Sequence, residues 1–151
     1  MKDLDYFIFV LLGLSVGITI ASQAGINAAL RGGFQTPVQA ALISFVIGAF
    51  LLGLIAWAQG DQWRVENALA NLPWWAWLGG VLGAFNVAMS IFLAPRLGAL
   101  LLAGSVITGQ MLASLLLDKF GWLGYPKIDL DSKRLLGASF MLLGLYLVAA
   151  R

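Results

Sequence analysis

The chain has 151 residues, of which 61% are hydrophobic and 11% charged, and its formal net charge is +2. Soluble domains carry about a quarter charged residues, so this composition predicts one transmembrane domain over residues 1–151 without a soluble catalytic module. Cysteine and histidine are both absent from the sequence, which excludes disulfides, thiol nucleophiles, thiolate metal sites and the imidazole that most often performs acid–base work near neutral pH. The scattered basic residues give no electrostatic support for binding nucleic acid.

Apolar stretches of about twenty residues, the length that crosses the hydrocarbon core of a bilayer, recur along the chain. Segments rich in glycine, proline and charged residues separate them. The pattern predicts an all-α, polytopic integral membrane protein with five transmembrane helices at about 6–30, 37–58, 74–93, 98–117 and 134–150. We expect the first helix to be an uncleaved span, because its apolar stretch continues to Leu30.

The first predicted helix carries uncharged polar residues at four-residue intervals: Ser15, Thr19, Gln23 and Asn27. Residues at this spacing share one helix face, and such a face needs partner helices or water to satisfy it in a bilayer. We expect it either to line a solute pathway or to hold helices together through hydrogen bonds. The two amides are the stronger ligand candidates, since each has donors and an acceptor.

Further polar side chains lie on the third and fourth predicted helices. Asn86 shares a helix face with Gly79 and Gly83, and the fourth helix offers Ser105 and Gln110. We expect Asn86, Ser105 and Gln110 to belong to the same substrate pathway. Small residues let helix backbones approach closely. The glycines that we expect to serve helix packing are Gly79, Gly83, Gly137 and Gly144.

The middle of each predicted span lacks Asp, Glu, Lys and Arg. Ionisable residues inside the membrane are the usual proton relays, so exchange of a proton for a cation has no obvious residue in this sequence. The spans also lack a nucleophile–base pair and a cluster of metal ligands. We therefore expect a protein that is not an enzyme, with no cofactor and no metal site.

Several short motifs, taken together in their order and spacing, resemble a known family. They are Gln23-x-x-x-Asn27, Pro37 with Phe45 and Gly48, Trp77-Leu78-Gly79-Gly80, Pro95-x-Leu97-Gly98, Gly109-Gln110 and Asp118-x-Phe120-Gly121. This pattern resembles the YdcZ-like family of bacterial inner-membrane proteins, which is grouped with the drug/metabolite transporter superfamily. The similarity runs nearly from end to end.

The resemblance implies that the chain corresponds to one five-helix half of a larger transporter, located in the bacterial inner membrane. It also implies an antiparallel pair, formed with an identical copy inserted the other way or with a related, oppositely oriented chain. The weak excess of Lys and Arg on the amino-terminal side of the five-span topology is compatible with dual orientation. By the same resemblance, Gln23, Asn27 and Gln110 are the family's polar motif residues.

The sequence thus favours a small transporter subunit that moves a small polar or weakly charged organic solute by alternating access. A narrow channel is a second interpretation, because glycine-rich helices and hydroxyl groups are compatible with a pore. A membrane scaffold or assembly partner without transport activity is a third, in which the polar face of the first helix only joins helices.

Overall fold

The computed structural model describes residues 3–60 and 71–150, and every regular element in these ranges is helical. The chain divides between Arg96 and Leu97 into two compact units. The first unit contains α1 (Asp3–Leu30), the 3-10 turn η1 (Arg31–Gly33), α2 (Pro37–Gln59) and η2 (Trp74–Leu78). Helix α4 (Gly79–Phe120) begins in the first unit and continues into the second, which also holds η3 (Trp122–Gly124) and α5 (Ser132–Ala149).

Four helices in the described residues are long and apolar enough to cross a membrane, at Ile8–Gly33, Pro37–Gln59, Trp74–Phe120 and Ser132–Ala149. The all-α, membrane-spanning class is therefore confirmed, whereas the prediction of five spans is not. The predicted third and fourth helices lie within the one segment Trp74–Phe120, because the helix continues past Pro95. A break does occur three residues later, at Gly98, where φ is 74° and ψ is 168°.

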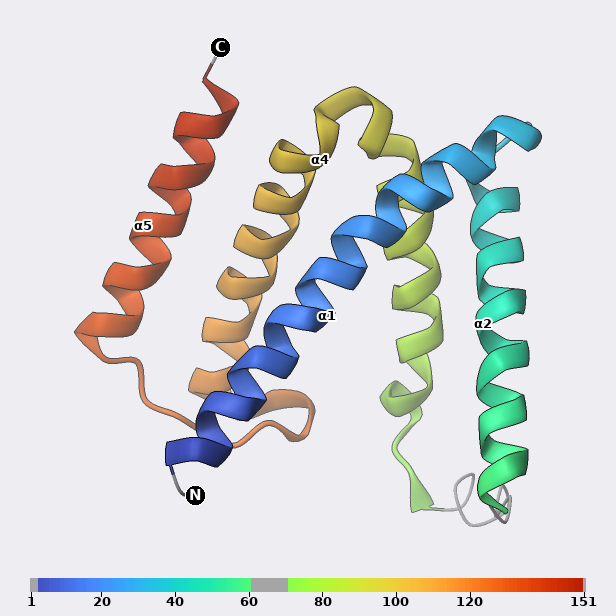
Figure 1. Ribbon diagram of the computed structural model, residues 1–151. Coiled ribbons are helices and arrows are strands. Elements are labelled where there is room, and N and C mark those ends of the chain that lie inside the picture. The colour runs from blue at the N-terminus through green and yellow to red at the C-terminus, as the bar shows by residue number, and fades with distance from the viewer. Residues whose placement is uncertain (1–2, 61–70, 151) are drawn as a thin grey trace. The chain divides into compact units, whose positions relative to one another are not determined.

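Helices α1 and α2 form a hairpin whose connection is fixed by local hydrogen bonds (Figure 1). The Thr36 hydroxyl accepts from the Gln39 backbone N–H, and the Gln39 side chain accepts from the Thr36 N–H, which is a capping box. Pro37 occupies the first turn of α2, where its missing N–H leaves no hydrogen bond unmade. The sequence therefore starts α2 at a defined residue, close to the end of α1.

The first unit has a small buried core where α2 packs against the first part of α4. Ala40 and Ile91 are completely buried and Ala41 nearly so, with Leu30 and Val87 packed against them. Phe45 lies beside Gly83, where an added Cβ would come within 3.4 Å of its ring. Small residues at these positions allow the two helices to approach closely. This contact fixes the position of α2 along the first part of α4, and with it the positions of the α2 side chains.

In the second unit, the connection between α4 and α5 folds back on the end of α4. The Ile128 N–H donates to the Asp118 carbonyl oxygen, and the Arg134 guanidinium contacts the Asp118 carboxylate at 2.8 Å. Asp131 caps α5 by accepting from the Arg134 N–H at 2.8 Å. Gly104 of α4 packs near Leu145 of α5. The predicted last helix therefore exists and begins two residues earlier than expected, at Ser132.

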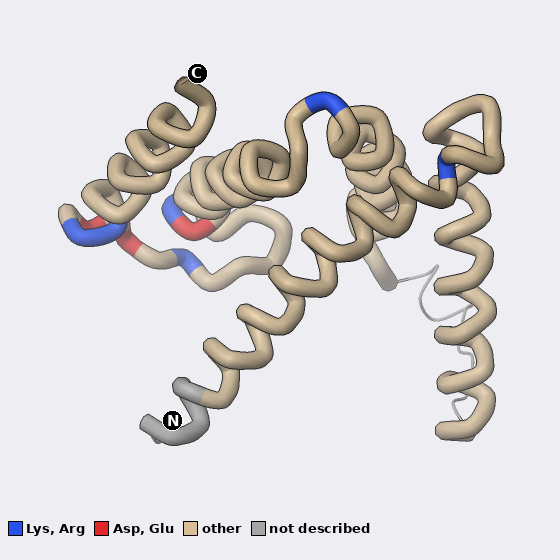
Figure 2. The backbone as a smooth tube through the Cα atoms, turned by 45° about the horizontal axis from the view of Figure 1, so that its top comes forward, with Lys and Arg blue, Asp and Glu red and all other residues tan. Residues whose placement is uncertain are grey.

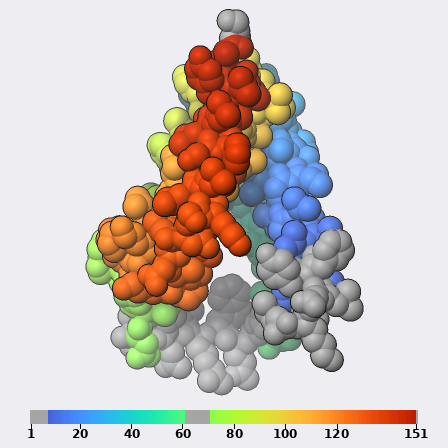
Figure 3. Space-filling model, turned by 90° about the vertical axis from the view of Figure 1, so that its left-hand side faces the viewer, coloured from blue at the N-terminus to red at the C-terminus, as the bar shows by residue number. Residues whose placement is uncertain are grey.

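Most charged residues of the described chain lie at helix ends and in connections; Arg96 is the exception, inside α4 two residues before the break at Gly98 (Figure 2). Most large hydrophobic side chains are exposed, Phe140 and Tyr146 of α5 among them. Figure 3 shows α5 at the surface. In water such a surface is unfavourable, whereas lipid chains cover it without cost. Exposure and charge distribution thus both agree with a bilayer environment.

Candidate functional site

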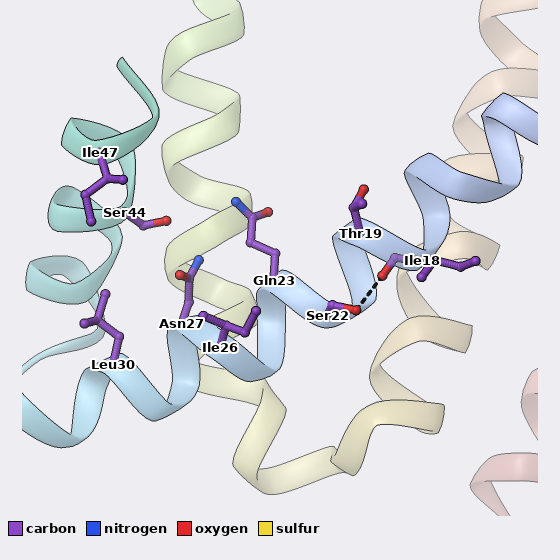
Figure 4. Close-up of a pocket in the computed structure, with 9 residues that line it drawn as sticks. All are labelled: Ile18, Thr19, Ser22, Gln23, Ile26, Asn27, Leu30, Ser44 and Ile47. Carbon is purple, nitrogen blue, oxygen red and sulfur yellow. Dashed lines mark hydrogen bonds between the residues drawn. The ribbon is translucent and has the colours of Figure 1, made fainter. Parts of the chain in front are cut away.

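An open groove of about 630 Å³ lies in the first unit, and side chains of α1 and α2 line it (Figure 4). Helix α1 contributes polar and apolar groups from its second half, and α2 contributes one hydroxyl and one isoleucine. The lining residues are Ile18, Thr19, Ser22, Gln23, Ile26, Asn27, Leu30, Ser44 and Ile47. The volume falls within the range of about 300–1,000 Å³ that is usual for sites that bind small molecules.

The hydroxyl groups of α1 are hydrogen-bonded to the helix that carries them. Ser15 donates to the Leu12 carbonyl at 2.7 Å, Thr19 to Val16 at 2.8 Å and Ser22 to Ile18 at 2.9 Å. Serine and threonine make such bonds readily, because the hydroxyl lies close to the carbonyl one turn earlier. These groups therefore have their donors satisfied without any partner outside α1.

The amides of the same helix face differ from the hydroxyls. Gln23 and Asn27 have no hydrogen-bond partner in the part of the chain that the structure describes, and Figure 4 shows both projecting from one side of α1. Asn27 is only 4% exposed. The described residues nonetheless include no enclosed, unpaired side-chain N or O atom, so the remaining access to the Asn27 amide comes from the groove that it lines.

The groove is electrically neutral. All nine lining residues are uncharged, and Arg31, which follows the last of them on α1, belongs to η1 outside the lining. The described residues contain no group of three acidic side chains that could hold a metal ion. What the groove offers a ligand is hydrogen bonding at the amides and the Ser44 hydroxyl, together with apolar contact at its isoleucines.

The structure brings together three of the seven residues predicted for the pathway: Thr19, Gln23 and Asn27. Ser15 lies one turn away from Thr19 on α1, outside the lining. Asn86, on the first part of α4, accepts a hydrogen bond from Ser90 at 3.3 Å and is likewise outside it. Ser105 and Gln110 belong to the second unit, where Ser105 donates to the Leu101 carbonyl. The pathway roles of all seven stay predictions.

Ser44 was not expected from the sequence, although a signal for it exists. It carries the only hydroxyl or amide side chain of α2 between Gln39 and Gln59, and a lone hydroxyl in an apolar span is costly unless it finds a hydrogen-bond partner. Two features prevented the prediction of Ser44 as a groove residue. Helix α2 lacks the four-residue repeat of α1, and the register of α2 against α1 is set by packing around Ile91.

Of the four glycines predicted to serve packing, Gly83 is the one with a neighbour in the described residues, the Phe45 ring. At Gly79, Gly137 and Gly144 an added Cβ would meet no described atom within 4 Å. These three positions are open surfaces of the single chain, and their packing role stays a prediction.

Long apolar helices that are exposed along their length, with uncharged stretches long enough to cross a bilayer, define an all-helical membrane protein. The family described as "Putative inner membrane exporter, YdcZ" matches residues 8–147. The chain belongs to this family, as the sequence motifs predicted. Comparison with curated proteins and with solved structures gave no match.

Proposed function

We propose that this chain is the subunit of a small exporter of the inner membrane, in which the groove of the first unit is part of the solute site. The observation that carries the proposal is Asn27, an amide that is 4% exposed, unpaired among the described residues and lining the groove. An amide that is kept from water by lipid or apolar side chains and finds no partner costs about 1–3 kcal/mol. Such a cost is reasonable where a ligand or a partner chain supplies the missing hydrogen bonds.

We further propose that α4 crosses the bilayer twice, which restores five spans. A straight helix of the 42 residues in α4 would be about 63 Å long, roughly twice the thickness of the hydrocarbon core. The non-helical backbone at Gly98 and the proline at 95 supply a place to turn. Arg96, beside this place, stacks on Phe92 and donates to its carbonyl oxygen, as suits a group at the membrane surface.

A second copy, inserted in the opposite direction, would complete the site. In the most apolar 18-residue stretch of the first span, no residue is buried within the chain. The same helix carries the polar side chains of Thr19 and Gln23 on its exposed surface. An exposed amide is unfavourable against lipid. An antiparallel partner would cover this face and leave an enclosed, neutral cavity, and exchange between two equivalent arrangements would give alternating access.

Transport can be tested without knowing the substrate. Proteoliposomes that contain the full chain are loaded with a bacterial metabolite extract, and solutes that leave the lumen are identified by mass spectrometry. We expect at least one organic solute to leave faster than from liposomes without protein, with a saturable rate. The double variant Gln23→Ala/Asn27→Ala should abolish the difference, whereas Ser139→Ala, which removes a hydroxyl of α5 bonded to the Leu135 carbonyl of its own helix, should keep it. Equal efflux from empty liposomes would refute the proposal.

The orientation is tested in cells with paired reporters at the carboxyl terminus, each active on one side of the membrane. Signal from both reporters supports an antiparallel pair of identical chains. Signal from one reporter alone contradicts that arrangement and requires an oppositely inserted partner of different sequence.

A further inference from the structure

Three polar groups of the groove are unpaired among the described residues, and they come from two helices. Asn27 and Gln23 project from α1, and the Ser44 hydroxyl is directed toward them from α2 (Figure 4). Ser44 differs in this respect from Ser15 and Ser22, whose hydroxyls donate to backbone carbonyls of α1. A cluster of this composition holds amide donors, amide acceptors and one hydroxyl that can act as either.

Apart from the Thr19 and Ser22 hydroxyls, which donate to carbonyls of α1 itself, the rest of the groove is apolar and accessible. Ile18 and Ile26 are each 67% exposed, and Ile47 is 61% exposed. These three side chains and Leu30 surround the polar cluster on α1 and α2. A ligand that satisfies only the polar cluster would leave this apolar surface uncovered, so the groove is suited to a molecule with both a hydrogen-bonding end and an apolar body.

We propose that the groove selects neutral amphiphilic solutes, whose uncharged hydrogen-bonding end meets Asn27, Gln23 and Ser44 while an apolar body lies on the isoleucines. This inference rests on the proposed function, since it names the substrate class of the same site. Asn27 is the anchor, because it is the most deeply buried of the three. Ser44 is a specificity-determining residue that adds a contact from the second helix.

Charged solutes are excluded by the same groove. An ion that leaves water for an apolar site needs a counter-charge or several hydrogen bonds, and the groove has no ionisable side chain to offer. A neutral amide or alcohol has a far smaller cost of leaving water, which the three polar groups can offset. The selection therefore acts against cations and anions alike.

The absence of cysteine from the sequence makes a labelling test direct. The variant Ile47→Cys places one thiol in the groove, and its rate of reaction with N-ethylmaleimide is measured on the full chain in lipid nanodiscs. Hexanamide, hexylammonium and hexanoate serve as probes that share an alkyl body and differ in the charge of the head. The matched control is Val46→Cys, the neighbouring exposed position outside the lining.

We expect saturating hexanamide to slow labelling of Ile47→Cys and the two ionic probes to leave it unchanged, with Val46→Cys insensitive to all three. Adding Asn27→Leu should weaken hexanamide protection about tenfold and Ser44→Ala about threefold, as the loss of one or two hydrogen bonds predicts. Adding Ser139→Ala, which removes a self-bonded hydroxyl of α5 outside the lining, should change nothing. If Asn27→Leu does not fold, as judged by circular dichroism, the comparison of Ser44→Ala with Ser139→Ala decides the same question.

Equal protection by the ionic probes, or none by hexanamide, overturns the inference about the solute class, whatever the efflux experiment gives. Protection that follows the expected pattern while no solute leaves proteoliposomes would keep the groove's selectivity and refute export. The two proposals can therefore fail separately.

Discussion

Helix α1 and the second part of α4 carry similar polar residues at helical spacing, yet they use them differently. In α4, Ser105 and Thr108 donate to the Leu101 and Gly104 carbonyls of the same helix, and Thr108 is 4% exposed. In α1, Asn27 is equally buried and has no such bond. A hydroxyl can bond within its own helix, whereas the amides of α1 do not. The kind of polar group, rather than its spacing, distinguishes a packing residue from a candidate ligand.

The largest expected effect comes from loosening the core that places α2 against the first part of α4. Ile91→Ala should lower the free energy of unfolding by about 2–3 kcal/mol, because it removes the side chain that is completely buried against Ala40. Unfolding by SDS in mixed micelles, followed by tryptophan fluorescence, measures the change. Phe85→Ala, on the same helix but 65% exposed, is the control; an equal loss there would mean that Ile91 is not a core residue.

A second effect concerns the break at Gly98, where the second part of α4 begins. Gly98→Ala should destabilise the protein by about 1–3 kcal/mol, since a φ of 74° with a ψ of 168° is accessible almost only to glycine. The same SDS titration measures it. Gly53→Ala, at a helical glycine of α2 with open space around it, should be neutral or stabilising. A neutral Gly98→Ala would show that the break does not require this backbone conformation.

The comparison itself is tested by exchanging the polar group at each buried position for an apolar one of similar size. Asn27→Leu should reduce probe binding about tenfold and leave stability unchanged or improved, because an unpaired amide is replaced. Thr108→Val should leave binding unchanged and lower stability by about 1 kcal/mol, because a hydrogen bond is lost. Labelling of Ile47→Cys and SDS unfolding provide the two readouts. An equal loss of probe binding in Asn27→Leu and Thr108→Val would show that the unpaired amide and the self-bonded hydroxyl do not differ in their contribution to binding.

The smallest effect is expected at the ion pair of the second unit. Asp118→Asn should change the free energy of unfolding by about 0–1 kcal/mol, because Asp118 and Arg134 are both partly exposed and solvent screens their attraction. Unfolding at low and high salt measures the contribution. A large, salt-insensitive loss would instead show that the ion pair is shielded from solvent.

The sequence predicted the helical membrane class, the family and the start of α2 correctly, because hydrophobic length and helix caps are local properties. Pro37 and Thr36 mark a helix start wherever they occur. The break near Pro95 was harder to place, since proline and glycine both interrupt helices and only the backbone of Gly98 shows which one does so here. The groove depended on the register between α1 and α2. Repeats within α1 could indicate Gln23 and Asn27, but no local pattern could indicate Ser44.

The capped turn between α1 and α2 has a consequence for how the protein is made. All groove residues lie between Ile18 and Ile47, and the turn that joins their helices is closed by bonds among Gln35, Thr36 and Gln39. Contacts this close in sequence form rapidly, and the amino-terminal part of a chain folds first during synthesis. We therefore expect the α1–α2 hairpin to enter the membrane as one unit. The polar groove side chains of α1 and α2 would then lie close together before the ribosome has synthesised all of α4.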